Sequence, residues 1–268
     1  MDHNLLEIKD LYVQYTADGR AVEAVNGITI TVKKGDTLGL VGQTGAGKTT
    51  TALAIMGLVP DPPGKVTSGE ILLNGENLLQ KSAKDMRTIR GKDIAMIFQD
   101  PMTSLNPVLP VGDQIREVIL LHEKLSKTEA THKACQMLEL VGIPAERYDE
   151  YPHQFSGGMK QRVIIAIALA CNPKLLIADE PTTALDVTIQ AQILEMLKKL
   201  NRESGISMLF ISHNLNVVRK LCRRVAVMQR GVLVENGETE QVFYHPQHPY
   251  TKRLIEAIPT RERKEERP

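Results

Sequence analysis

Alternating hydrophobic and polar positions in the first part of the chain predict strands rather than helices. The alternation covers Leu5–Val13 and Val25–Val32, and each segment is followed by a turn that contains Asp and Gly. Thr37–Val41 is instead almost wholly apolar, as expected of a strand buried on both faces. A glycine-rich turn follows it, and we predict a helix over Thr50–Leu58. Further strand-like segments are Glu70–Leu73 and Ile94–Phe98.

The middle of the chain changes to the spacing of a helix. From Val111 to about Val141, apolar residues recur every three or four positions, and we interpret residues 106–155 as a helical insertion. Later strand-like segments are Leu175–Ala178, Met208–Ile211 and Val225–Met228, and the helix between them has an apolar stripe of Ile189, Ile193, Leu197 and Leu200. Strands that alternate with helices indicate an α/β fold with a mostly parallel sheet.

Composition narrows the class of protein. The 268 residues are 42% hydrophobic and 24% charged, which is enough apolar material for a packed core and excludes a disordered chain. The net charge of +1 argues against a dedicated nucleic-acid-binding protein, because such domains are usually strongly basic. The longest apolar run, Val163–Cys171, is far shorter than the roughly 20 residues of a membrane-spanning helix.

The first residues of the chain and the cysteines indicate an intracellular protein. The first residues lack the basic start and apolar run of a signal peptide. Cys135, Cys171 and Cys222 are too scattered for a disulfide framework or a metal site. Thr260–Pro268 alternates charges of both signs and is predicted to be a solvated tail. A peripheral membrane partner stays compatible with all of these features.

The segment Gly42–Thr49 reads GQTGAGKT and carries the sharpest chemical signal. It matches G-x-x-x-x-G-K-[ST] between a buried strand and a helix, where backbone N–H groups can converge on a phosphate. Lys48 can reach the β- and γ-phosphates, and the Thr49 hydroxyl can bind Mg²⁺. The alternative is a glycine-rich turn with a surface lysine. The predicted nucleotide-binding residues here are Gly42, Gln43, Thr44, Gly45, Ala46, Gly47, Lys48, Thr49 and Thr50.

Two further segments gain meaning beside this loop. Leu175–Asp179 is an apolar run that ends in an aspartate able to hold Mg²⁺, and Glu180 follows in a position to polarise a water molecule. Alone, two acids after a strand are more often simply solvated. Ser156, Gly157 and Gly158 open another helix with a hydroxyl and free N–H groups, an arrangement that suits an anion but also an ordinary helix cap.

Taken in this order, the motifs resemble those of the ATP-binding subunits of ABC transporters, and the resemblance covers nearly the whole chain. The matching segments are a Walker A loop at Gly42–Thr49, a Walker B strand at Leu175–Asp179, a signature motif at Ser156–Gly158, a Q-loop glutamine at Gln99, a D-loop at Thr183-Ala184-Leu185-Asp186, a switch histidine at His213 and an adenine-facing aromatic at Tyr15. Six motifs in family order, apart from Tyr15, are far more specific than any one of them.

This resemblance implies an α/β fold: a P-loop NTPase core with a mostly parallel sheet, an N-terminal antiparallel β portion and a helical insertion. Residues 1–105 and 156–257 would form the ABC ATPase core, 106–155 the insertion and 258–268 a charged tail. The implied cofactors are ATP and Mg²⁺, with the metal held by Thr49, Gln99 and Asp179. The implied catalytic residues are Glu180, His213, Gln99 and Lys48. Two subunits, identical or different, would sandwich ATP, each signature motif closing on its partner's γ-phosphate.

Two segments resemble the oligopeptide, dipeptide and nickel importers within this family: Phe155–Met159 and Tyr244–Thr251. The implied function is ATP hydrolysis that energises import of peptides or nickel. The implied partners are membrane-embedded permease subunits, which would dock near Gln99 and Asp100–Pro107, and, indirectly, an extracellular substrate-binding protein. The chain would then lie peripherally at the cytoplasmic face of the membrane, without nucleic acid as a partner. Tyr244–Thr251 also allows a proline-rich surface turn or, with its two histidines, a metal site.

Two positions depart from the family pattern. Met159 stands where most members have a glutamine, which removes a side-chain donor from the signature motif. Asn214 follows His213 where an aspartate is common, so the details around the switch histidine stay open.

Other classes of function are less consistent with the sequence. A GTPase would carry an N-K-x-D segment, which does not occur here. ABC-type ATPases that act on nucleic acid or in translation usually have a long coiled-coil insertion or a duplicated unit, but this class stays the main alternative. A purely regulatory binding module is disfavoured because Glu180 and His213 are both present.

Overall fold

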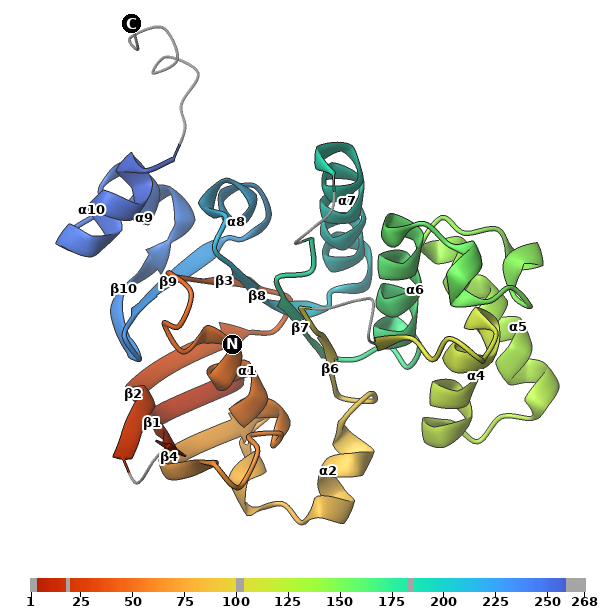
Figure 1. Ribbon diagram of the computed structural model, residues 1–268, viewed down its shortest axis with the longest axis horizontal. Coiled ribbons are helices and arrows are strands. Elements are labelled where there is room, and N and C mark those ends of the chain that lie inside the picture. Colours follow the sequence, from red (N-terminus) through yellow and green to blue (C-terminus); the bar gives the residue numbers. More distant parts are fainter. Residues whose placement is uncertain (1–3, 18–19, 100–103, 183–185, 259–268) are drawn as a thin grey trace, which may run out of the picture.

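A computed structural model describes residues 4–17, 20–99, 104–182 and 186–258. The chain forms two β-sheets and surrounding helices (Figure 1). The first sheet is antiparallel and consists, in spatial order, of β2 (Arg20–Lys33), β1 (Asn4–Ala17), β4 (Gly64–Leu73) and β5 (Glu76–Asn77). It is the N-terminal antiparallel portion that the sequence predicts, with strands longer than the alternating segments because pairing continues beyond the buried residues.

The second sheet forms the centre of the molecule. Its spatial order is β10 (Val232–Glu238), β9 (Arg224–Gln229), β3 (Thr37–Val41), β8 (Ser207–Ser212), β7 (Leu175–Asp179) and β6 (Ile94–Ile97). All neighbouring pairs are parallel except β10 with β9, which confirms the predicted mostly parallel sheet. β10 was not predicted, because its residues are only partly buried and lack a clear alternation.

Apolar side chains cover both faces of this central sheet. In β8, Leu209 and Ile211 join the core beneath the antiparallel sheet, whereas Met208 and Phe210 join the core beneath the helices. This alternation explains why the strand is apolar at nearly every position. The central sheet is therefore the middle layer, with the antiparallel sheet and the helix Lys48–Met56 on one side and most of the other helices on the other.

The helices given for the described residues are α1 (Lys48–Met56), α2 (Ala83–Ile89), α4 (Val111–His122), α5 (Lys127–Leu140), α6 (Gly157–Leu169), α7 (Val187–Ser204), α8 (Leu215–Leu221), α9 (Thr239–Tyr244) and α10 (Pro249–Glu256), with short 3₁₀ turns at Leu78–Gln80, Ala145–Arg147 and Pro152–Gln154. Figure 1 shows α4, α5 and α6 grouped at one end and α1 near the antiparallel sheet. In the part of the chain that the structure describes, no helix is both long and apolar enough to span a membrane.

The continuous helical spacing predicted from Val111 to Val141 is in fact two helices, α4 and α5. The break precedes Ser126, whose hydroxyl accepts a hydrogen bond from Glu129 N–H, while the Glu129 carboxylate accepts one from Ser126 N–H. Such a capping box starts a new helix. The serine and the glutamate three residues later are the sequence signal for this helix start. The prediction missed it because the apolar spacing continues across the break.

The segment Tyr244–Thr251 is only in part a turn. It joins the end of α9 to the start of α10, and Tyr250 and Thr251 are buried. The proline-rich composition therefore reflects a helix start, with Pro249 in the first turn of α10. The predicted tail, Thr260–Pro268, lies outside the described residues, and the boundaries of core, insertion and tail remain predictions.

Replacing Ser126 by alanine is expected to lower the free energy of unfolding by about 1 kcal/mol, because the cap of α5 is lost. The control is Ser204→Ala at the exposed C-terminal end of α7, where alanine is the better helix former and no loss is expected. Urea denaturation followed by circular dichroism measures both. Equal stability of Ser126→Ala and wild type would contradict a role for this cap.

Candidate functional site

Strand β3 leads through a tight loop into α1, which begins at Lys48 and ends at Met56 rather than spanning the predicted Thr50–Leu58. Gly47 caps the helix with φ 100°, a left-handed conformation that suits glycine. A side chain there would also collide with the carbonyl oxygen of Ala24. The helix therefore starts immediately after Gly47 and places its first N–H groups at the loop.

Lys48 is buried beneath the loop. Its ammonium donates hydrogen bonds to the carbonyl oxygens of Gly42, at 2.9 Å, and Gln43, at 3.0 Å. Burial lowers the pKa of Lys48, while the nearby charges of Glu180 and Asp179 act to raise it. The alternative of a surface lysine is thus wrong: this side chain is 5% exposed and is held by the loop that it follows.

Asp179 ends strand β7 beside the same helix start and is 1% exposed. Burial raises the pKa of its carboxyl, against a hydrogen bond with the Thr49 side chain and the charge of Lys48, both of which lower it. Its Oδ1 atom is buried and has no hydrogen-bond partner among the described residues. A buried carboxylate oxygen without a donor is costly and indicates a place for a bound ligand.

Glu180 lies at the centre of a polar cluster made by three strand ends. Its Oε2 accepts a hydrogen bond from Gln99 Nε2 at 3.2 Å, and its Oε1 lies 3.0 Å from Nδ1 of His213. Glu180 has φ 47°, a left-handed conformation that is uncommon for a residue other than glycine. Its N–H donates to the carbonyl of Ile211 in β8, which fixes this turn.

Eight of the seventeen predicted site residues line one cavity of about 290 Å³. Its lining combines the loop, the start of α1 and the ends of β6 and β7. The lining residues are Ala24, Thr44, Gly45, Gly47, Lys48, Thr49, Thr50, Gln99 and Glu180. Ala24 was not predicted, because its contribution comes from a strand distant in sequence and nothing in its own sequence context marks it.

The signature segment lies away from this cavity. Ser156 caps α6, its hydroxyl accepting a hydrogen bond from Met159 N–H at 3.3 Å. Gly157 is exposed, while Gly158 lies so close to Ile189 of α7 that a side chain there would collide with it. Figure 1 shows α6 well separated from α1. None of these three residues lines the cavity.

Tyr15 also lies outside the cavity lining. It belongs to β1, opposite Val22 in β2 and Gly64 in β4, and its ring leaves no room for a side chain at Gly64. Its predicted contact with adenine therefore stays a prediction.

Of the predicted D-loop, Thr183, Ala184 and Leu185 lie outside the described residues. Asp186 caps α7, and its side chain accepts a hydrogen bond from the Ile189 N–H at 2.9 Å.

The two departures from the family pattern have defined surroundings. The sulfur of Met159 contacts Nη1 of Arg147 at 3.4 Å, and the Arg147 guanidinium also stacks on the ring of Phe155. Asn214 caps α8 by accepting the N–H of Asn216 at 3.1 Å, a role that an aspartate could equally fill.

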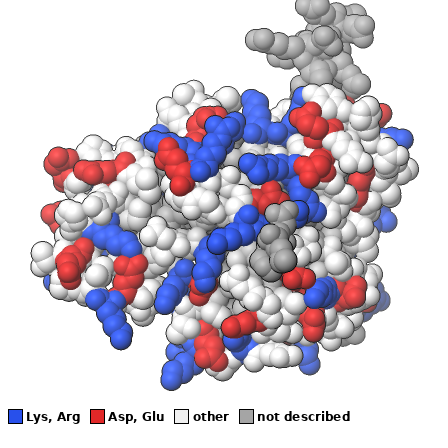
Figure 2. Space-filling view, turned by 180° about the vertical axis from the view of Figure 1, so that it is seen from behind, with Lys and Arg blue, Asp and Glu red and all other residues white. Residues whose placement is uncertain are grey.

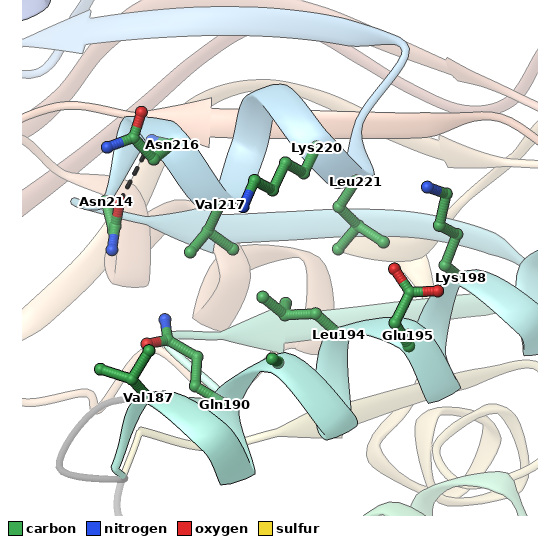
Figure 3. A pocket seen from close by; sticks show the side chains of 11 residues that line it. Val187, Gln190, Leu194, Glu195, Lys198, Asn214, Asn216, Val217, Lys220 and Leu221 are labelled. Carbon is green, nitrogen blue, oxygen red and sulfur yellow. Dashed lines mark hydrogen bonds between the residues drawn. The ribbon is translucent and has the colours of Figure 1, made fainter. Parts of the chain in front are cut away.

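A second cavity, of about 240 Å³, lies between α7 and α8 (Figure 3). Leu194, Val217 and Leu221 form its apolar lining, and Lys198 and Lys220 lie at its edge. None of the predicted catalytic or nucleotide-binding residues lines it.

On the face seen in Figure 2, basic side chains lie among acidic ones rather than forming a field of one sign.

Two family models match the sequence. The model described as ABC transporter matches residues 25–183, which include the loop, the signature segment and the acidic strand end. The model described as oligopeptide/dipeptide transporter, C-terminal region, matches residues 234–268. The second match includes the segment that suggested the peptide importers.

Full-length relatives and solved structures agree with these matches. The oligopeptide transport ATP-binding protein OppD of Bacillus subtilis is 55% identical over 96% of this chain and 73% of its own length. The dipeptide transport ATP-binding protein DppD of the same organism is 52% identical over 95% of this chain and 77% of its own length. A dimeric post-hydrolysis structure of the ATP-binding cassette MJ0796, bound to ADP and Pi, matches with a TM-score of 0.79 at 27% identity, covering 87% of this chain and 98% of that one. With its P-loop fold and converging motifs, the chain therefore belongs to the ABC transporter family as an ATP-binding subunit that hydrolyses ATP in transport.

Proposed function

We propose that this chain is the ATP-hydrolysing subunit of a peptide importer. The observation that carries the proposal is the convergence of Lys48, Thr49, Gln99 and Glu180 on one cavity, with buried Asp179 beside Thr49. In α/β sheets, ligands bind at the carboxyl ends of the parallel strands, where β6 and β7 deliver these groups. The alternative, an ATPase that acts on nucleic acid or in translation, has no feature of the site in its favour.

The phosphate groups of ATP would lie against the loop and the start of α1. Free N–H groups and the positive end of the helix dipole suit an anion there. The Lys48 ammonium donates hydrogen bonds to two loop carbonyls. From the same buried position, it can donate to phosphate oxygens instead. ATP binding would thus use groups that the fold already holds in place.

The residues around Asp179 fit a magnesium ion. The unpartnered Oδ1 of Asp179 and the adjacent Thr49 hydroxyl are oxygen ligands, the type that Mg²⁺ prefers. Thr49, Asp179 and the amide oxygen of Gln99 would hold the ion. Bound there, it would neutralise charge on the phosphate oxygens.

Hydrolysis needs a water molecule aligned with the γ-phosphorus. The Glu180 carboxylate would accept a proton from this water as the water oxygen bonds to phosphorus and the bond to ADP breaks. Gln99 and His213 already contact the two carboxylate oxygens and would hold Glu180 in orientation. His213 contacts Glu180, which lines the cavity, and its side chain is 55% exposed, so it could also turn toward the γ-phosphate.

One subunit does not supply the whole active site. Ser156, Gly157 and Gly158 lie outside the cavity, yet their helix start offers a hydroxyl and N–H groups suited to phosphate. We propose that a second ATP-binding subunit presents this cap to the cavity and that ATP joins the pair. The dimeric form of the MJ0796 cassette supports this arrangement. The partner can be a second copy or a related chain.

The relatives support a proposal for the cargo and the location. Both Bacillus subtilis proteins are named for peptides, so we propose a peptide rather than nickel as the cargo. Permease subunits would hold the chain at the cytoplasmic face of the membrane and receive cargo from an extracellular binding protein. Asp100–Pro107, next to Gln99, is the proposed contact with the permease, although residues 100–103 lie outside the described residues.

Replacing Glu180 by glutamine is expected to retain Mg·ATP binding but to lower the rate of hydrolysis at least about a hundredfold, because the proton acceptor is lost. Calorimetry measures binding and phosphate release measures turnover. The matched variant Lys48→Ala should instead lose binding itself. Normal turnover in Glu180→Gln would remove this residue from the proposed role, and unchanged ATP binding in Lys48→Ala would reject the phosphate-binding loop.

Replacing Ser156 by arginine is expected to abolish hydrolysis in the assembled pair while each subunit still binds ATP. The long side chain would block the cap from closing on the partner, but Ser156 does not line its own cavity. Ser204→Arg, at the exposed end of α7, is the control for adding an arginine. Full activity of Ser156→Arg would contradict an active site shared between two chains.

Replacing Asp179 by asparagine is expected to raise the melting temperature of the protein without nucleotide, in EDTA, at neutral pH. The raised pKa of Asp179 means that folding disfavours its charged form. This penalty is complete above the raised pKa and shrinks as the pH falls from there toward the ordinary pKa of aspartate. The difference in melting temperature between variant and wild type should therefore shrink in acid. Exposed Asp149→Asn is the control. A lower melting temperature for Asp179→Asn at neutral pH would contradict this account.

A further inference from the structure

The segment Tyr244–Thr251 has no role in the proposed hydrolysis, yet one of its residues reaches the phosphate-binding loop. Tyr250, in the first turn of α10, is 4% exposed, and its hydroxyl oxygen accepts a hydrogen bond from the Gln43 N–H at 3.1 Å. The two residues are 207 positions apart in sequence. A buried tyrosine hydroxyl usually has a polar partner, and here that partner is the backbone of the loop.

This contact fixes a peptide unit that also holds Lys48. The N–H of Gln43 and the carbonyl of Gly42 belong to the same planar peptide group. Tyr250 binds the N–H end, and the Lys48 ammonium donates to the carbonyl end at 2.9 Å. Rotation of this peptide would break both bonds together. The orientation of the Gly42 carbonyl, and with it the position of the ammonium, therefore depends on the tyrosine hydroxyl.

Tyr250 is itself anchored to the central sheet. Its N–H donates to Nδ1 of His248, the cap of α10, at 3.2 Å. The N–H groups of Gln247 and His248 donate to the two carboxylate oxygens of Glu235 in β10, at 2.8 and 3.0 Å. The turn before α10 is thus tied to a strand, which gives the hydroxyl a fixed position.

The loop around Gln43 borders two hollows beside Tyr250. Gln43, Thr44 and Gly45 are exposed, and two cavities of about 240 and 110 Å³ are both lined by Gln43 and Tyr250. Ala46 is held separately, its carbonyl accepting the Gly231 N–H at 3.0 Å. Gln229 also lines both hollows, and the Tyr250 hydroxyl is the group that forms the hydrogen bond to the Gln43 N–H between them.

We infer that Tyr250 is a positioning residue of the nucleotide site. Its hydroxyl holds the Gly42–Gln43 peptide in the orientation that keeps Lys48 ready for phosphate before ATP arrives. Without it, the loop divides its time among several orientations, and apparent affinity falls with the fraction that is competent to bind. The inference rests on the proposed role of residues 42–49 in binding ATP. It assigns to the C-terminal region an effect on nucleotide affinity.

The variant Tyr250→Phe keeps the ring and removes only the hydroxyl. We expect the Kd for Mg·ATP from calorimetry and the KM for ATP to rise about tenfold, the scale of leaving one N–H unpaired. The value of kcat at saturating ATP should change less than about twofold, because ATP restores the loop once it is bound. If Tyr250 had only a structural role, Tyr250→Phe would lower the melting temperature of the protein. The rise in KM at nearly constant kcat would then not be seen.

Tyr244→Phe is the matched control, because it removes the hydroxyl of an exposed tyrosine in the same segment that contacts Arg219 and not the loop. Its ATP affinity should equal that of wild type. Wild-type affinity of Tyr250→Phe, or an equal loss in both variants, would overturn the inference. If the wild-type chain binds no ATP, the proposed function fails instead.

Hydrogen exchange on the wild-type protein tests the contact without a variant. The Gln43 amide should exchange markedly more slowly than the exposed Thr44 amide in the absence of nucleotide, because only the former has the tyrosine as acceptor. Exchange of Gln43 at the rate of an open amide would overturn the inference even if Tyr250→Phe does not fold.

Discussion

Burial of the Lys48 ammonium at the ends of the parallel strands is the interaction on which the site depends. An isolated buried cation is very costly, so it must be paired and hydrogen-bonded. Here the Gly42 and Gln43 carbonyls accept its hydrogen bonds, and the carboxylates of Asp179 and Glu180 supply opposite charge. The loop, the end of β7 and the start of α1 must therefore coincide. The three-layer core holds them together by packing the central sheet on both faces.

The parts of the site that depend on local backbone chemistry could be predicted from the sequence. A loop that wraps a phosphate needs glycines and a lysine at fixed spacing, and a strand buried on both faces needs a continuous apolar run. Gly42–Thr49 and Leu175–Asp179 have these patterns, and the structure brings them together. The fold class followed from the same alternation of strands and helices and is confirmed.

The contacts of Ala24 and Tyr250 with the loop could not be predicted, because neither leaves a local pattern in the sequence. Ala24 restricts Gly47 through its carbonyl oxygen, a group that every residue possesses. Tyr250 contacts Gln43, which lies 207 positions earlier in the sequence. In the sequence, only its unusual neighbours, His248 and Pro249, drew attention to this segment. The proline-rich composition was compatible with a surface turn, since it does not show which side chains the following helix buries.

The loop receives support from two sides that differ in chemistry. On the inner side, the charges of Asp179 and Glu180 act on Lys48, and these groups are the ones that ATP and its hydrolysis would engage. On the outer side, a neutral hydroxyl holds a single peptide that no step of hydrolysis needs to move. A change in the inner groups therefore alters chemistry, whereas a change in the outer contact alters how much of the protein is ready to bind. Because Glu235 anchors that contact to β10, anything that shifts the C-terminal region would act on ATP affinity before it acts on turnover.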